Sequence, residues 1–438
     1  MPARNQTQPG ATRAGCRPGG DAVKRIFVSL TLAALLLSGC SSLKFWGKDE
    51  AEPVATGADA AAGEAQELTD KQKKEQKKKE KKAGEPNDLK KIEASVDLKR
   101  LWSLGVGKGQ EPQDATLVPV VVDGVVYAAS RDGRVMAADA AKGERRWRTD
   151  IDMPLTGGVG VGGGLVLVGT VEGDLVALRA GSGEEAWRVA LSSEMLAPPA
   201  ANADVVVVQT QDAKVLGFSV QTGKQLWIYE GDRPLLTLRA TAAPVMAETM
   251  AVVGFANGKL VAFDAASGTV VWEARVALPS GRTELERMVD VNTAVLGGDI
   301  LYAVSYQGRV AAYSRGTGRE LWARDASSHR APSLGTNQLY VVGAEDQVIA
   351  LRATGGQELW VNRDLRLRNL TAPQAIGDVV AVADVEGYLH LLSQVDGRIV
   401  GRVKVDGDGV STSLASDGER LYVLDNSGDL TAYGLRSD

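Results

Sequence analysis

The chain has 438 residues, of which 24% are charged and 44% hydrophobic, and a formal net charge of −5. With this excess of acidic residues, the composition gives no indication of nucleic-acid binding. It contains two histidines, His329 and His390, and two cysteines, neither of which lies beyond residue 40, so we expect no disulfide framework, no metal and no cofactor.

The N-terminus carries a secretory signal. A basic pair, Lys24-Arg25, precedes an apolar run at 26–37 that is too short for a transmembrane helix. The ending Leu37-Ser38-Gly39-Cys40 resembles the bacterial lipobox. We therefore predict a signal peptide over residues 1–39 and acylation of Cys40. The alternative is an ordinary signal peptide with an incidental cysteine.

Two further expectations concern this end of the chain. The basic region with which a signal peptide normally begins lies near residue 23, so we expect residues 1–22 to lie upstream of the true translation start. By resemblance to lipoprotein sorting signals, Ser41 in place of Asp after the anchor favours the outer membrane, on its periplasmic face. More than one acyl chain makes such anchoring stable.

Residues 40–95 show no pattern of a buried core. The segment Lys71–Lys82 holds eight Lys and two Glu, and such a composition cannot bury enough apolar surface to offset its ordering entropy. We predict a lipid-anchored disordered linker over 40–95. Contact of its lysines with anionic lipid or the cell wall is the alternative.

From Leu101 onward a unit of about forty residues repeats. A tryptophan follows a turn glycine by four residues in six units, and another turn slot lies ten residues before that glycine. Short apolar runs bounded by Asp-Gly, Asn-Gly and Thr-Gly turns are typical of hairpins. The repeated tryptophans are Trp102, Trp147, Trp187, Trp227, Trp272, Trp322 and Trp360.

Each unit is predicted to form four antiparallel strands, which bury both faces only when units stack radially. The turn slots give eight units, so we predict an all-β, eight-bladed β-propeller over 96–438. One Trp per unit is expected to pack between blades rather than to bind a ligand. The seventh unit has Gly401 where Trp is expected, and the eighth ends before its Trp strand. The orphan strand Leu98–Leu104 is therefore expected to close the last blade.

The connections between units differ in length. The distance from Trp to the next turn slot is 26 residues after Trp187, 31 after Trp227 and 36 after Trp272. The two insertions are consecutive and should leave the ring on one face, where loops on a rigid scaffold commonly carry function. They contain Leu235–Arg239 and Glu284–Asn292, and aliphatic residues beside Arg and carboxylate are typical of protein-binding hot spots.

The Thr-Gly-x-x-x-Trp repeat resembles PQQ-type propellers, and with the lipobox and eight blades it resembles the BamB family of lipoproteins. That resemblance implies a non-enzymatic scaffold of the Bam complex that binds BamA at its POTRA domains and assists assembly of nascent outer-membrane β-barrel proteins. Leu236, Leu238 and Arg239 match the family's Leu-x-Leu-Arg motif, and Asp290 matches the first residue of its Asp-x-Asp motif. Asn292 replaces the second Asp and removes a charge there.

Other interpretations stay open at this point. Leu236 and Leu238 could simply tuck under their loop, or a partner strand could pair with an exposed blade edge. The protein could be another lipid-anchored envelope adaptor. A PQQ-dependent dehydrogenase would need a PQQ pocket, Ca²⁺ and a catalytic Asp, and the vicinal cysteines of those longer enzymes are absent from this sequence.

Overall fold

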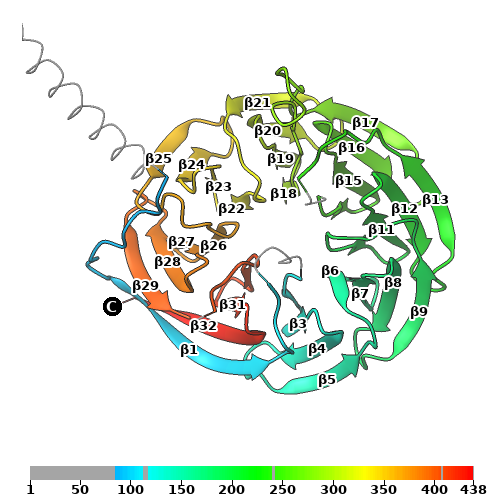
Figure 1. Ribbon diagram of the computed structural model, residues 1–438, viewed down its shortest axis with the longest axis horizontal. Helices are drawn as coiled ribbons and strands as arrows, with labels where there is room; N and C mark the ends of the chain where they lie inside the picture. Colours follow the sequence, from blue (N-terminus) through cyan, green and yellow to red (C-terminus); the bar gives the residue numbers. More distant parts are fainter. Residues whose placement is uncertain (1–83, 112–116, 239–241, 406–407, 438) are drawn as a thin grey trace, which may run out of the picture. The chain divides into compact units, whose positions relative to one another are not determined.

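The computed structural model describes residues 84–111, 117–238, 242–405 and 408–437. They form eight four-stranded antiparallel sheets arranged as blades around a ring, which confirms the predicted propeller (Figure 1). The predicted signal peptide, Cys40 and most of the linker lie outside the described residues, as does Arg239. The described segments include no helix of the length and hydropathy needed to cross a bilayer.

Blades 1 to 7 each use four consecutive strands, which follow one another from the innermost outward. Blade 1 contains β2 (Val120–Val122), β3 (Val125–Ala129), β4 (Arg134–Asp139) and β5 (Arg145–Asp150); blade 2 contains β6 (Leu155–Gly162), β7 (Leu165–Thr170), β8 (Asp174–Arg179) and β9 (Glu185–Ala190). Blade 3 contains β10 (Ala200–Ala201), β11 (Val205–Gln209), β12 (Lys214–Ser219) and β13 (Gln225–Glu230); blade 4 contains β14 (Val245–Ala247), β15 (Met250–Gly254), β16 (Lys259–Asp264) and β17 (Val270–Arg275).

Blade 5 contains β18 (Val295–Gly297), β19 (Ile300–Val304), β20 (Arg309–Ser314) and β21 (Glu320–Asp325); blade 6 contains β22 (Ser333–Leu334), β23 (Gln338–Val342), β24 (Val348–Arg352) and β25 (Glu358–Asn362). Blade 7 contains β26 (Gln374–Ile376), β27 (Val379–Ala383), β28 (Tyr388–Ser393) and β29 (Ile399–Lys404). Blade 8 combines β30 (Ala415–Ser416), β31 (Arg420–Leu424) and β32 (Asp429–Ser437) with β1 (Val96–Gly105).

The burial of each strand follows its place in the blade. The second strands are buried on both faces, as along β3 and β11, whereas the outer strands bury alternate residues. Hydrophobic clusters accordingly lie between neighbouring blades, where each sheet covers the next. The innermost strands contact one another in succession, and β2 contacts β30, which closes the ring.

Each repeated tryptophan joins its blade to the following one. The indole N–H of Trp227 donates to the carbonyl of Ala265 at 2.8 Å, and the ring covers Gly268. Gly268 has a φ of +72°, and a Cβ there would lie 2.5 Å from the indole, so only glycine fits. The other six indoles donate in the same way to the carbonyls of Ala140, Ala180, Val220, Arg315, Ala353 and Gln394.

The N-terminal strand closes the ring, as predicted. β1 pairs antiparallel with β32, from Leu98 opposite Leu435 to Leu104 opposite Leu430. In Figure 1 the two strands, blue and red, lie side by side although they come from opposite ends of the propeller. Trp102 then links this composite blade to blade 1 through Ala140.

The missing tryptophan of blade 7 has a structural cause. Gly401 pairs with Leu391, in the register at which Trp stands in other blades. The incoming chain fills that place, because Ser95 N–H donates to the carbonyl of Val400 at 2.9 Å and the carbonyl of Val96 lies against Gly401.

Residues 87–95, which the sequence assigns to the linker, pack along blade 7. Arg368 is almost fully buried; it donates to the Asp384 carboxylate at 2.7 Å and to the carbonyl of Asn87 at 3.1 Å. Arg402 donates to His390 at 3.0 Å and to the carbonyl of Lys90 at 2.8 Å. Burial would raise the pKa of Asp384, but hydrogen bonds from His390 and Arg368 hold that pKa below its usual range.

Candidate partner-binding site

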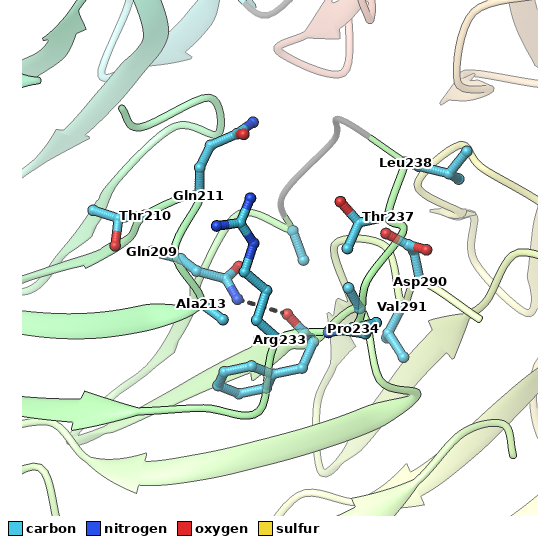
Figure 2. A pocket seen from close by; sticks show the side chains of 14 residues that line it. Gln209, Thr210, Gln211, Ala213, Arg233, Pro234, Thr237, Leu238, Asp290 and Val291 are labelled. Atoms are coloured by element: carbon cyan, nitrogen blue, oxygen red, sulfur yellow. Dashed lines mark hydrogen bonds between the residues drawn. The ribbon is translucent and has the colours of Figure 1, made fainter. Parts of the chain in front are cut away.

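Two consecutive long interblade connections, residues 231–244 and 276–294, meet at one pocket. They join β13 to β14 and β17 to β18. The pocket between blades 3 and 4 is lined by both connections and by the turns at 209–213 and 254–256 (Figure 2). The two insertions therefore leave on the same face, which we call the connection face. The cavity itself measures about 30 Å³, room for about one or two water molecules rather than for a cofactor.

The first connection exposes apolar side chains. Leu235 and Leu236 are 83% and 47% exposed, whereas Leu238 is half-buried and lines the pocket. Leu236 thus does not tuck under its loop. Isolated exposed leucines are ordinary, but here two adjacent ones lie beside a pocket.

Asp290 is buried in the same pocket, close to Thr237 and Leu238 (Figure 2). Burial raises its pKa to about 6. The backbone N–H groups of Asp290 and Leu238 oppose this rise in pKa, but neither carboxylate oxygen has a partner with hydrogen-bond geometry. An unpartnered buried carboxylate is costly, and it is suited to receive a donor from outside.

Asn292 has a different role in the structure. Its amide nitrogen donates to the carbonyl of His329 at 2.6 Å, and its oxygen accepts from the N–H of Thr293 at 2.6 Å. The side chain therefore fixes the connection after blade 5 and does not line the pocket. Burial, with a smaller contribution from Arg330, lowers the pKa of His329 to about 4.

Hydrogen bonds hold the two connections in place. Thr293 accepts from the N–H of Ala243 at 2.8 Å, which ties the second connection to the first. Within the second connection, Glu286 accepts from the N–H of Arg282 at 2.6 Å and of Thr283 at 3.1 Å, and Thr283 accepts from the N–H of Glu286. This reciprocal cap lowers the pKa of Glu286 and gives the loop a defined shape.

The structure adds residues that the sequence motifs do not include. Arg233 is exposed and extends into the pocket toward Gln211 (Figure 2). Leu278 and Leu285, in the second connection, are 70% and 62% exposed. Both leucines lie in the longest insertion between repeats, and that position in the sequence is the signal that could have identified them.

The predicted site residues fall into three groups. Leu238 and Asp290 lie together in the pocket, Leu236 lies exposed beside it, and Asn292 faces the next connection. Arg239 lies outside the described residues. Within the described ranges, no three His, Cys, Asp or Glu side chains are placed to hold a metal ion.

Comparison with known proteins agrees with this architecture. The family model described as "Outer membrane protein assembly factor BamB" matches residues 131–362. A second, described as the β-propeller domain of glucose/ethanol/alcohol dehydrogenase, matches residues 87–159. The chain is 52% identical to outer membrane protein assembly factor BamB of Pseudomonas aeruginosa over 352 residues, which cover 80% of this chain and 93% of that relative.

Two further relatives extend the likeness. The BamB of Xanthomonas campestris is 36% identical over 427 residues, covering 95% of this chain and 98% of that protein. The crystal structure of BamB from Moraxella catarrhalis superposes with a TM-score of 0.70 at 30% identity, covering 77% of this chain and 100% of the other. Fold and repeat define an eight-bladed propeller of the PQQ-repeat class. The chain belongs to the BamB family, whose members named above are assembly factors and not enzymes.

Proposed function

We propose that this protein is a scaffold lipoprotein of the Bam complex that docks BamA, through its POTRA domains, on the connection face. The docking residues are Leu236, Leu238, Arg239 and Asp290, and Asn292 positions the neighbouring connection. In this role it assists assembly and insertion of β-barrel proteins into the outer membrane, held at the periplasmic face by acylated Cys40.

One observation carries the proposal: half-buried Leu238 and unpartnered Asp290 share a pocket, with Leu235 and Leu236 exposed beside it. Aliphatic anchors fill apolar hollows on a partner, and the buried carboxylate receives a donor once water is excluded. The hydrogen bond from Ala243 to Thr293 fixes the relative positions of the two connections before binding, which lowers the entropy lost on association.

The test is co-purification of BamA with the detergent-solubilised protein. Leu238→Asp and Arg239→Glu are expected to abolish co-purification while the unfolding midpoint stays close to that of the wild type. Arg398→Glu is the matched control, since Arg398 lies on an exposed turn of blade 7. Undiminished co-purification of the first two variants would refute the docking site.

A further inference from the structure

A second pocket lies at the seam where the ring closes, between blades 8 and 1. It is lined by residues 108–111 of the connection from β1 to β2, by Arg131 and Asp132 in the turn after β3, and by Asn426 and Ser427 in the turn after β31. Its volume is about 620 Å³, within the usual range of ligand pockets. We call it the seam pocket.

The seam pocket is the topological counterpart of the pocket between blades 3 and 4. Both lie between the turns that follow the second strands of adjacent blades, beside the connection that joins those blades. The connections also match in length, since 31 residues separate Trp102 from Gly133, as they separate Trp227 from Gly258. The same ring therefore presents two such hollows on its connection face.

Unpartnered polar atoms are concentrated at the seam. Gln110 is 9% exposed, and neither its amide nitrogen nor its oxygen has a hydrogen-bond partner. Asn426 is 8% exposed; its nitrogen donates to the carbonyl of Asp408 at 2.9 Å and to Ser411 at 3.1 Å, so its orientation is fixed and its oxygen is left unpaired. Buried polar groups are nearly always paired, so two such side chains in one pocket call for an explanation.

Two more unpartnered oxygens lie on the blade 1 side. They are the hydroxyl of Ser130 and one carboxylate oxygen of Asp132, and each would lie 2.4 Å from a Cβ built on Gly107. The seam thus offers mainly acceptors, together with the donors of Gln110 and Ser130.

This set of atoms is matched by a peptide backbone. A free carboxamide such as that of Gln110 pairs with one peptide group, because each has one N–H donor and one carbonyl acceptor facing the other. The oxygens of Asn426 and Asp132 accept further N–H groups. Of the residues lining the pocket, Pro154 is the one large apolar side chain, so the walls favour recognition of the main chain over an apolar anchor.

The charges of the pocket disfavour ions. Lys108 and Arg131 line the pocket, and Asp132 already pairs one carboxylate oxygen with Arg134 at 3.5 Å, so the pocket is poor for a divalent cation, which collects several free carboxylates. Glu111 and Asp408 line it as well, so the mixed signs do not favour a phosphate either.

We propose that the seam pocket binds an extended polypeptide segment by hydrogen bonds between the side chains of Gln110 and Asn426 and the backbone amides of that segment. This site is separate from the BamA docking site proposed above. It gives the propeller a second polypeptide contact on the same face.

The test uses the full chain in detergent and a short fluorescein-labelled Gly/Ser peptide, with binding followed by fluorescence anisotropy. The matched probe is the same peptide N-methylated at alternate residues, which removes N–H donors without changing charge. We expect the N-methylated peptide to bind about ten-fold more weakly, and Gln110→Leu to weaken binding of the unmodified peptide by a similar factor. Gln357→Leu, at an exposed turn, should bind as the wild type does.

Two further measurements on Gln110→Leu, its unfolding midpoint and its co-purification with BamA, distinguish loss of the seam pocket from misfolding and from loss of the docking site. Gln110→Leu removes an unpaired buried amide, so its unfolding midpoint should equal or exceed that of the wild type. It should also retain BamA on co-purification, which separates this proposal from the docking site. Absence of peptide binding, equal binding of both peptides, or a calcium-induced rise in midpoint that Gln110→Leu abolishes would each overturn the proposal.

Discussion

The carbonyl oxygen of Val96 lies so close to Gly401 that a Cβ at residue 401 would come within 2.5 Å of it. Seven blades place a tryptophan at the corresponding position, and the eighth position is filled by the chain as it enters β1. Blade 7 therefore lacks its tryptophan because glycine at residue 401 leaves room for the chain that closes the ring.

This contact makes Gly401→Ala destabilising. The added methyl group meets a backbone carbonyl that cannot move without disturbing β1, so we expect a loss of about 1–3 kcal/mol in the free energy of unfolding. Gly355→Ala is the control, because nothing lies within 4 Å of its Cβ and the change should be neutral or slightly stabilising. Equal denaturant midpoints for the two variants would show that Val96 does not hold this position.

Loss of β1 should destabilise the whole ring. A chain that begins at residue 106 leaves β32 as an open edge and removes the packing of Leu98 and Trp102. Compared with a chain that begins at residue 96, we expect its thermal midpoint to fall by roughly 10 °C or more. Calorimetry would detect this, and superimposable transitions would contradict closure by the N-terminal strand.

Asp290→Asn should stabilise the protein at neutral pH. The folded pKa of Asp290, about 6, lies above its ordinary value of 3.8, so the folded state holds the proton more tightly. The stability from that proton is complete below pH 4 and is lost as the pH rises through 6. We expect the variant to gain about 2–3 kcal/mol at pH 7 and little at pH 4.

The control for this pH series is Asp232→Asn, an exposed residue of the first connection. A stability gain for Asp290→Asn that does not change between pH 4 and pH 7 would mean that its carboxylate does not titrate as a buried group.

Arg368→Met should weaken the attachment of residues 87–95 and destabilise blade 7. The substitution leaves the fully buried Asp384 without its guanidinium partner, and removing one member of a buried ion pair costs about 3–5 kcal/mol. Adding Asp384→Asn should restore part of the loss. Arg398→Met, in an exposed pair, should change the free energy of unfolding by less than about 1 kcal/mol. A single variant as stable as the wild type would contradict the role of this pair.

The sequence predicts the blades well because their determinants are local and recur. In each unit the turn glycines determine where the strands end, and one Trp packs its blade against the next, as Gly268 and Trp227 illustrate. Each of the two insertions joins the outermost strand of one four-stranded antiparallel blade to the innermost strand of the next, so both must leave the ring on the same face. For this reason Leu238 and Asp290 could be expected near each other.

Other features depend on contacts between distant parts of the chain. Asn87 docks on Arg368, 281 residues away, and no local pattern in a polar segment indicates this. The burial of Asp290 and the turn of Asn292 toward His329 likewise depend on how two loops pack together. Composition therefore indicates a linker up to residue 95, whereas packing on blade 7 determines the conformation of residues 87–95.

The most direct measurement is calorimetric binding of the purified protein to the POTRA domains of BamA, with two matched leucine variants. Leu236 on the first connection and Leu226 on the rim of blade 3 are 47% and 46% exposed, so aspartate at either position should cost similar stability. If the connection face docks BamA, Leu236→Asp weakens binding at least about ten-fold and Leu226→Asp leaves it unchanged. Equal affinities for the two variants, or a loss confined to Leu226→Asp, would contradict the account.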